Sequence, residues 1–352
     1  MLTQTLAPVV ALSLAGSAYG AAFDSYDHLH ARDFAEQQGK QVHGTRVAHL
    51  FRRSGTCQFP DYEGMVAVQS GGQNGGWALS SDQQCSYGSW CPYACQPGQL
   101  MAQWDSSSTS YSYPQSQYGG LYCDENGNLQ KSRSDQDYCT DGTGTVRATN
   151  NANSGVSFCQ TVLPGNEEML IPTSVDSGSS QSLAVPGPDY WAGTAAHYYV
   201  NAPGVSTSDA CQWGSSANAQ GNWAPYVAGM NTDSSQNTFV KIGWNPVYLE
   251  SSSPFRNQMP DFGIKVTCDD ESSCTGLPCG IDPSSQSVNE VSGDGSAGDG
   301  GAQFCVVTVK NGAKASIEVF DSDGNSKSKR DVAHHGHAAV AVETVYKTVT
   351  AA

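Results

Sequence analysis

The chain has 352 residues, of which 14% are charged, and its formal net charge is −16 at pH 7. An excess of carboxylates repels nucleic acid and anionic membranes, whose binding depends on Lys and Arg, so the composition favours a neutral ligand. The 38 glycines predict short strands and frequent turns.

The N-terminal segment 1–20 carries a short apolar run from Leu6 to Ala18, followed by small residues. This pattern is typical of a secretory signal peptide, although the segment before the run has no Lys or Arg. A membrane anchor is the alternative, but the run is shorter than the ~20 residues that a spanning helix needs. We therefore expect a secreted protein with no membrane association after cleavage.

Residues 21–53 contain four histidines and no cysteine, and they end at the dibasic pair Arg52-Arg53. An exposed dibasic pair in a secreted chain is a typical processing site, because nicking concentrates at loops and chain ends. We predict a pro-segment over 21–53. An ordinary solvated pair of arginines is the alternative.

The next segment, 54–268, begins the cysteine-bearing body. In an oxidising compartment an even set of twelve cysteines predicts disulfides. Zinc is the competing interpretation for Cys85, Cys91 and Cys95, but their spacing of five then three residues has no matching second pair. Redox catalysis would favour Cys-x-x-Cys, which this run lacks. We expect every cysteine from Cys57 to Cys305 to be oxidised, with no metal and no other cofactor.

Four runs of the body predict strands: 64–70, 195–202, 238–244 and 262–268. They are rich in Val, Ile, Tyr and Phe, and Gly, Pro, Asn and Ser bound them. Long helical periodicity is missing. The pattern favours an all-β, disulfide-rich sandwich.

The composition changes again over 269–325. A tight cysteine loop comes first, and 292–301 has the composition of a flexible acidic linker. Two β-rich runs then flank Asn311-Gly312, which predicts a small β-hairpin extension. Cys305 lies in the first run, and we expect it to pair with another cysteine, for which the 268–279 loop is the candidate.

The last segment, 326–352, contains a second dibasic site at Lys329-Arg330. Its composition predicts a disordered tail. Three histidines of this tail could bind a metal, but a solvated, untethered tail is the favoured interpretation.

Several unusual motifs occur together in the body. They are the Cys-x5-Cys-x3-Cys run that starts at Cys85, PYACQPGQLMAQW ending at Trp104, GGLYCDENGNL (119–129), FCQTVLPGNEEMLIP (158–172), AHYYVNAPGVSTSDACQWG (196–214) and GNWAPYVAG (221–229). Over roughly 57–267 the chain resembles the fungal SUN family of secreted cell-wall proteins. It departs from that family by lacking a long Ser/Thr-rich N-terminal region and by carrying the extra cysteine-rich segment, so it is similar to the shorter branch.

The resemblance implies a secreted cell-wall protein with roles in wall morphogenesis, septation and cell separation. It implies a glycoside hydrolase that acts on β-1,3-glucan or a related wall polysaccharide, and a thaumatin-like sandwich with an acidic cleft. A non-catalytic glucan-binding protein of the wall is the alternative. The family's catalytic residues do not carry over, so the candidates below rest on residue types.

Hydrolysis of a glycosidic bond takes two carboxyl groups, one protonated and one ionised. Glu167, in a motif that matches the family, is the favoured carboxyl group, and Asp124 is its candidate partner. The alternatives are a helix-capping or turn role for Glu167 and a turn role for Asp124. Glu168 is less favoured because relatives often place an amide there. Asp105 and Asp261 are more typical of surface or turn positions.

Sugar rings bind by packing their C–H faces on flat aromatic side chains. The candidate substrate-binding residues are Trp104, Tyr122, Trp223 and Trp244. Packing in the core is the alternative for each of them. For Trp213, beside Cys211, we expect the core.

Overall fold

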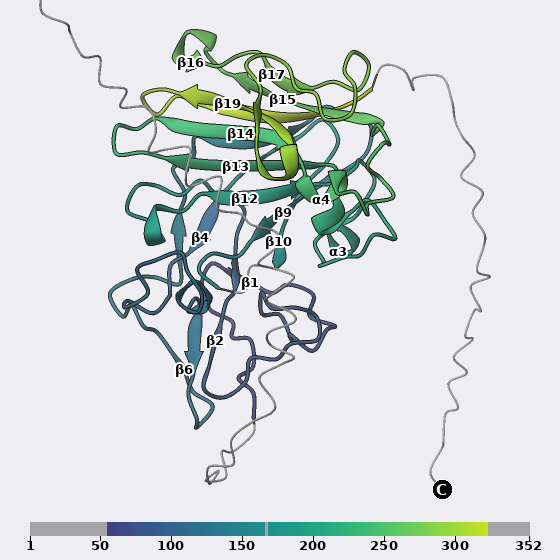
Figure 1. Cartoon of the computed structure of the whole chain (residues 1–352). Coiled ribbons are helices and arrows are strands. Elements are labelled where there is room, and N and C mark those ends of the chain that lie inside the picture. The colour runs from purple at the N-terminus through teal and green to yellow at the C-terminus, as the bar shows by residue number, and fades with distance from the viewer. Residues whose placement is uncertain (1–54, 166–167, 323–352) are drawn as a thin grey trace, which may run out of the picture.

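Two β-sheets packed face to face make up most of the protein, seen in a computed structural model that describes residues 55–165 and 168–322 (Figure 1). The larger sheet has eight strands in the order β10-β9-β12-β13-β14-β19-β16, with β18 beside β19. The second sheet has five strands in the order β11-β8-β20-β15-β17. The expected signal peptide, pro-segment, dibasic sites and tail lie outside the described residues.

The bounds of the strands confirm most of the expected runs. In the larger sheet they are β9 (Val156–Thr161), β10 (Met169–Val175), β12 (Ala196–Val200), β13 (Tyr226–Thr232), β14 (Thr238–Trp244), β16 (Cys274–Thr275), β18 (Ser296–Ala297) and β19 (Gln303–Val309). In the second sheet they are β8 (Val146–Asn150), β11 (Ser180–Ser182), β15 (Phe262–Cys268), β17 (Cys279–Ile281) and β20 (Ala315–Asp321). The run at 64–70 contributes only β1 (Met65–Val66) and a bridge at Val68.

Helices are short throughout the described part of the chain. They are α3 (Thr207–Ala210), α4 (Pro246–Leu249) and the 3₁₀ turns η1 (Gln115–Gln117), η2 (Trp191–Gly193), η3 (Gly221–Trp223), η4 (Glu271–Ser273) and η5 (Asp299–Gly301). The all-β prediction is therefore confirmed. None of the helices in residues 55–165 and 168–322 is long and apolar enough to cross a bilayer.

The core lies between the two sheets and follows from strand alternation, since successive side chains point to opposite faces. On β12, Tyr198 and Val200 are buried in this core, whereas His197 lies on the outer face. Tyr226 of β13 crosses the core and donates a hydrogen bond to the Phe262 carbonyl oxygen of β15 at 2.9 Å. Its hydroxyl thus has the partner that burial requires.

The expected hairpin across Asn311-Gly312 is absent. Both residues have positive φ, +55° and +69°, as in a hairpin turn. However, β19 pairs with β14 in the larger sheet, and β20 pairs with β15 and, in parallel, with β8 in the second sheet. The turn therefore carries the chain from one sheet to the other. Residues after 268 complete the sandwich rather than extend it.

The segment 292–301, for which the composition predicts a flexible linker, is ordered instead. Its strand β18 pairs with β19, in register Ser296 to Phe304. The Ser292 N–H donates to the Gly280 carbonyl at 2.8 Å, and the Gly298 N–H donates to the Ala302 carbonyl at 2.9 Å. Backbone pairing of this kind overrides the glycine-rich composition.

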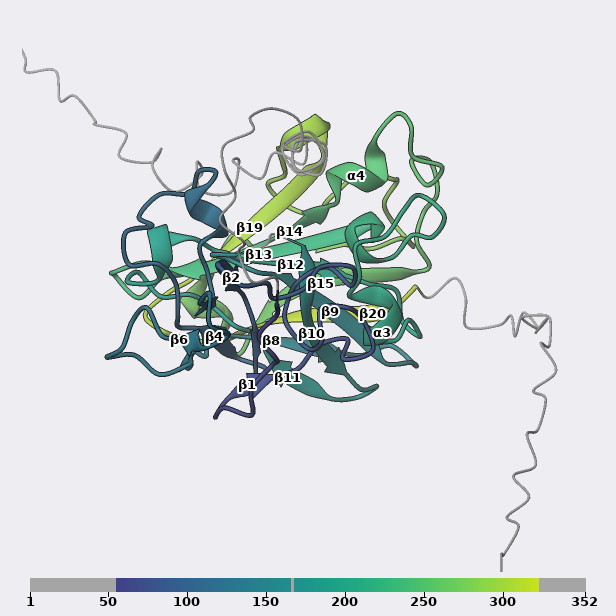
Figure 2. The same cartoon turned by 90° about the horizontal axis from the view of Figure 1, so that it is seen from below.

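Residues 55–145 form a disulfide-rich N-terminal module beneath the larger sheet (Figures 1 and 2). Its regular structure is scant, with β2 (Ser89–Cys91), β3 (Ala94–Cys95), β4 (Gln99–Met101), β5 (Leu121–Cys123), β6 (Leu129–Gln130) and β7 (Cys139–Asp141). Three bridges hold it together, namely Cys57–Cys123, Cys85–Cys91 and Cys95–Cys139. Such bridges substitute for the extended core that short strands cannot supply.

All twelve cysteines form disulfides, as the sequence predicts. Outside the module the bridges are Cys159–Cys211, Cys268–Cys274 and Cys279–Cys305. The last of these confirms the expected partner region for Cys305. Because Cys279 lies on β17 and Cys305 on β19, this bridge ties the two sheets together inside the core.

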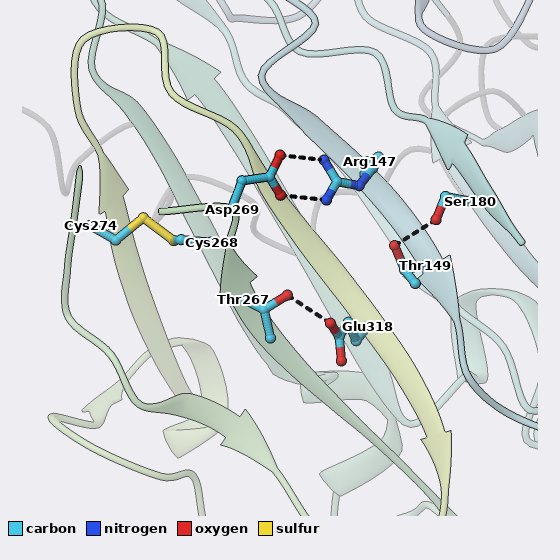
Figure 3. Close-up of polar contacts among 8 residues, drawn as sticks. All are labelled: Arg147, Thr149, Ser180, Thr267, Cys268, Asp269, Cys274 and Glu318. Carbon is cyan, nitrogen blue, oxygen red and sulfur yellow. Dashed lines mark hydrogen bonds and ion pairs between the residues drawn. A yellow bond between two sulfur atoms is a disulfide. The ribbon is translucent and has the colours of Figure 1, made fainter. Parts of the chain in front are cut away.

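The outer face of the second sheet carries polar side chains that satisfy one another (Figure 3). The Arg147 guanidinium and the Asp269 carboxylate form a two-pronged ion pair, and this bond holds the pKa of Asp269 below its usual value. Nearby, the Thr267 hydroxyl donates to Glu318 at 2.8 Å. These groups are therefore already partnered with one another.

We expect the inter-sheet bridge to contribute more stability than the surface bridge. In the chain-entropy description, Cys279→Ala/Cys305→Ala, whose cysteines are 26 residues apart, loses about 3–4 kcal/mol of unfolding free energy. Cys268→Ala/Cys274→Ala, with a separation of 6, loses about 2 kcal/mol. Denaturant unfolding of the two double variants measures this difference. Equal losses would contradict the inter-sheet role, and free thiols in non-reducing mass spectrometry would contradict the pairing itself.

Candidate functional site

The loop between β9 and β10 docks onto the N-terminal module at one junction. The Gly165 N–H donates to the Ser116 carbonyl at 2.7 Å. A Cβ atom on Gly119 would lie 1.8 Å from the Pro164 carbonyl oxygen, and one on Gly165 would lie 2.9 Å from Pro92 Cβ. The two glycines therefore permit a contact that any side chain would prevent. We call these five residues the hairpin junction.

A second loop of the N-terminal module contacts the hairpin junction at Pro92. The Ala78 N–H donates to the Pro92 carbonyl at 2.9 Å, so the segment 77–82 runs along the junction. Its exposed Asp82 lies close enough to Glu168 to act on it electrostatically. Two carboxyl groups from distant parts of the sequence thus meet beside the hairpin junction.

Glu168 is the described carboxyl group whose protonation is most perturbed. It is half-buried directly before β10, and desolvation together with the negative charge of Asp82 raises its pKa to about 7. A carboxyl group with such a pKa remains largely protonated up to neutral pH and is able to donate a proton there. This is the property that glycosidases require of their acid.

Three half-exposed aromatic side chains lie next to the junction, and we call them the aromatic trio. The ring of Trp90 lies 5.3 Å from that of Tyr122 and 6.4 Å from that of Tyr118 between centroids. Trp90 and Tyr122 are partners across β2 and β5. Trp90 and Pro92 are two residues apart and Tyr118 precedes Gly119, so the trio adjoins the hairpin junction.

Of the two carboxyl groups favoured from the sequence, Glu167 and Asp124, only Asp124 is described by the structure. Glu167 lies outside the described residues, between Gly165 and Glu168. Asp124 caps the turn between β5 and β6, where it accepts hydrogen bonds from the Asn126 and Asn128 N–H groups at 2.8 Å each. These bonds, those from Asn128 above all, hold the pKa of Asp124 below its usual value. Asp124 therefore has the properties of a turn residue, the alternative to a catalytic role.

Three of the four expected substrate-binding aromatics are buried. Trp244 is 1% exposed in the sandwich core, and its indole N–H donates to the Glu290 carbonyl at 2.9 Å. Trp104 and Trp223 are each 8% exposed. The guanidinium of Arg133 covers the Trp104 ring at 3.9 Å from its centroid. Such side chains cannot stack on a sugar without rearrangement, so of the four only Tyr122 lies in the aromatic trio beside the junction.

The structure brings forward three further residues, and the sequence points away from two of them, Trp213 and Glu168. Trp213, expected in the core, is 39% exposed, because the disulfide buries only its neighbour Cys211. The sequence ranks Glu168 below Glu167 because relatives often place an amide at that position, and nothing local indicates its burial. The exposure of Trp90 on a fixed loop could be predicted from its place between Cys85 and Cys91, because the disulfide between them holds the loop and its ring rigidly.

A groove of about 850 Å³ lies on the second sheet, away from the junction, and its lining includes Asp282 and Asp321. Hydrogen bonds from Ser284, first of all through its side chain, hold the pKa of Asp282 below its usual value. Asp321 accepts a hydrogen bond from the Asn153 N–H at 3.0 Å. The lowered pKa of Asp282 favours its ionised form, which does not suit it to protonate a leaving group.

Comparison with known proteins fits this arrangement. The family model described as β-glucosidase (SUN family) matches residues 52–307, which include the N-terminal module, the hairpin junction and most of both sheets. The chain belongs to the SUN family. No solved structure matches it, so the thaumatin-like part of the fold prediction stays a prediction.

Relatives of this SUN-family chain occur in two yeasts. An uncharacterised protein of Saccharomyces cerevisiae is 72% identical over 305 residues, covering 85% of this chain and 86% of the relative. The probable secreted β-glucosidase adg3 of Schizosaccharomyces pombe is 51% identical over 278 residues, 79% of this chain but only 24% of that protein. The probable secreted β-glucosidase UTH1 of S. cerevisiae is 37% identical over 268 residues, 72% of this chain and 66% of the relative.

Removing the Glu168 charge should change the pH dependence of stability. The folded state keeps this proton up to about pH 7, whereas the unfolded chain releases it near the ordinary value of 4.5. Between these values the unfolded state binds fewer protons, so the wild type loses stability as the pH rises. Glu168→Gln avoids that loss. We expect equal melting temperatures near pH 4 and a variant about 5–10 °C more stable at pH 8.

Thermal melts of both proteins across this pH range measure the effect. Glu63→Gln, at an exposed carboxyl group, controls for the loss of one negative charge. A Glu168→Gln variant whose melting temperature stays parallel to that of the wild type at every pH would contradict the raised pKa.

Proposed function

We propose that the protein is a secreted glycosidase that cleaves β-1,3-glucan or a related polysaccharide of the cell wall, with Glu168 as the proton donor. The observation that carries the proposal is the half-buried carboxyl group of Glu168, with its pKa of about 7, beside the exposed aromatic trio. Relatives named probable secreted β-glucosidases support both the reaction class and secretion. Wall morphogenesis, septation and cell separation are the processes in which this activity would act.

In the proposed reaction Glu168 gives its proton to the glycosidic oxygen as the bond from that oxygen to the anomeric carbon breaks. One sugar leaves as an alcohol, and water supplies the hydroxyl group that ends on the anomeric carbon. The second carboxyl group either activates that water or first attacks the sugar itself. Asp82 and Glu167 are the candidates for this role. Asp82 has the support of its electrostatic contact with Glu168, and Glu167 that of its motif.

The aromatic trio would bind the glucan chain. Trp90 and Tyr122 present half-exposed rings on one face of β2 and β5. Apolar sugar faces pack on such rings, while their hydroxyl groups remain free to bind polar groups. Since the trio adjoins the hairpin junction, a bound sugar would lie beside the loop that leads to Glu168.

The alternative is a glucan-binding protein of the cell wall that performs no chemistry. The aromatic trio alone would suffice for that role. A proton-donating carboxyl group would not be needed, and its burial costs stability above pH 4.5, because desolvation opposes the charged form. We therefore favour the enzyme.

The catalytic proposal predicts a large loss in Glu168→Gln. The amide keeps the size of the side chain but has no acidic proton, so the rate of β-1,3-glucan cleavage should fall by about 10²–10⁴. Reducing-end release from purified wild type and variant measures this loss, and thermal melts confirm that both are folded. Glu167→Gln, assayed in parallel, tests whether Glu167 is the second carboxyl group.

Two outcomes would contradict the proposal. Equal cleavage by Glu168→Gln and wild type would remove Glu168 from the mechanism. A folded wild type that binds glucan without cleaving it would establish the non-catalytic alternative.

The pH profile offers an independent prediction. Because the acid must be protonated, kcat/KM should fall as the pH rises through about 7. Thermal melts across pH need no turnover, so they can also test Asp82→Asn, which removes the negative charge that helps to raise the pKa of Glu168. The loss of stability with rising pH should then end at a lower pH than in the wild type. Burial, the larger cause, remains in the variant, so the shift should be partial. An unchanged pH dependence of stability in Asp82→Asn would contradict the electrostatic contact with Glu168.

A further inference from the structure

Trp213 is the most exposed tryptophan in the described part of the chain, with 39% of its surface accessible. It borders a shallow pocket of about 230 Å³ together with Asp209, Gln212, Asn218 and Gln220. We call this group the Trp213 pocket. An exposed indole is costly to leave in water, and a single large ring among amides and a carboxylate is the composition of a polar ligand site.

The loop that carries Trp213 is fixed at both ends. At its start, Cys211 is joined to Cys159 of β9, and the Cys211 carbonyl accepts a hydrogen bond from the Gln69 side chain at 3.2 Å. The Gly214 N–H, one residue after the indole, donates to Asn222 Oδ1 at 2.8 Å. The ring is therefore held in place before any ligand arrives, which lowers the entropic cost of binding.

Three buried asparagines continue this support into the sandwich. Asn222 is 6% exposed, and its carbonyl accepts a hydrogen bond from the fully buried Asn245 side chain at 2.8 Å. Fully buried Asn201 accepts from the Gly221 N–H at 2.8 Å. The far end of the loop is thus tied to the framework by bonds that are shielded from water, where they are stronger.

The polar groups of the pocket retain capacity for a ligand. Asp209 Oδ2 accepts a hydrogen bond from Ser206, but Asp209 Oδ1 has no partner among the described residues. The Trp213 indole N–H, the Asn218 amide and Gln212 Oε1 likewise make no hydrogen bond to any residue in 55–165 or 168–322. Donors and acceptors therefore surround one apolar ring. Neutral hydroxyl groups satisfy both kinds, whereas a cation would leave the donors unused.

We propose that the Trp213 pocket binds one sugar ring of a neutral polysaccharide, as a subsite separate from the aromatic trio. The indole would pack against the C–H face of the sugar, and Asp209, Gln212 and Asn218 would bind its hydroxyl groups. This inference rests on the proposed function for the identity of the polysaccharide, a β-1,3-glucan, and it adds a second point of attachment.

The position of the pocket suits a single continuous ligand. Helix α3, which ends beside Cys211, lies against β9 and β10 (Figure 1). Cys159, the partner of Cys211, lies two residues, or about 7 Å, along β9 from Thr161 and points to the same side. Thr161 pairs with Met169, the residue after Glu168. The loop that carries Trp213 and the residue after Glu168 are therefore anchored two residues apart along β9, which keeps the Trp213 pocket and Glu168 within the span of one polysaccharide chain.

The test measures binding separately from cleavage. In a Glu168→Gln background, where the ligand would not be consumed, we would titrate a soluble β-1,3-gluco-oligosaccharide and record affinity and indole fluorescence. Trp213→Ala should bind about tenfold more weakly. Trp213→Tyr, which keeps a flat ring with a polar tip, should restore most of the affinity. Tyr62→Ala removes an aromatic ring that is 37% exposed and stacked on Tyr138, and it serves as the matched control.

The outcomes separate this inference from the proposed function. Unchanged affinity in Trp213→Ala, or an equal loss in Tyr62→Ala, would overturn the subsite. If the subsite exists, Trp213→Ala in the otherwise native protein should also bind insoluble glucan more weakly than the wild type does. Failure of the wild type to cleave any glucan, with a Trp213-dependent affinity intact, would reject the enzyme and keep the subsite.

Discussion

The contact between the two sheets is the constraint on which the rest of the structure depends. Tyr226 spans the layers to the backbone of Phe262, and the Cys279–Cys305 bridge joins them covalently a few strands away. Everything functional is attached to the outer side of the larger sheet or to the loops at its β10 edge. If the layers shifted, the start of β10, which positions Glu168, would shift with them.

The N-terminal module solves a different problem. Its strands have two or three residues, too few to form a stable sheet alone, so disulfides and close backbone contacts replace the missing ladder. Gly119 and Gly165 allow the β9–β10 loop to approach the module so closely that a Cβ atom on either glycine would clash with its neighbour across the contact. Glu168 follows this loop, and its own burial is the main cause of its raised pKa.

Sequence patterns predicted what local chemistry determines. Alternation identified β12, β14 and β15, and the secreted character and even number of cysteines identified the disulfides. The sequence patterns predicted the turn at Asn311-Gly312 but not which strands it connects. Each flanking strand pairs with strands that are far away in the chain. The same limit applies to Glu168 and Trp213. The burial of Glu168 depends on the module, and the exposure of Trp213 depends on the loop that the buried asparagines hold. Neither can be predicted from the neighbouring residues in the sequence.

The place of β20 has a consequence for how the protein is made. It is inserted between β8 and β15, with Ala315 opposite Val146, although it is the last described strand in the chain. Until its residues leave the ribosome, β8 and β15 have unpaired edges and the core is open on that side. The module can form its three disulfides during synthesis, but the sandwich cannot form until β20 has been made. The second sheet therefore cannot close before nearly all of the described chain has been made, and until then its strands β8 and β15 expose apolar side chains and unpaired backbone groups.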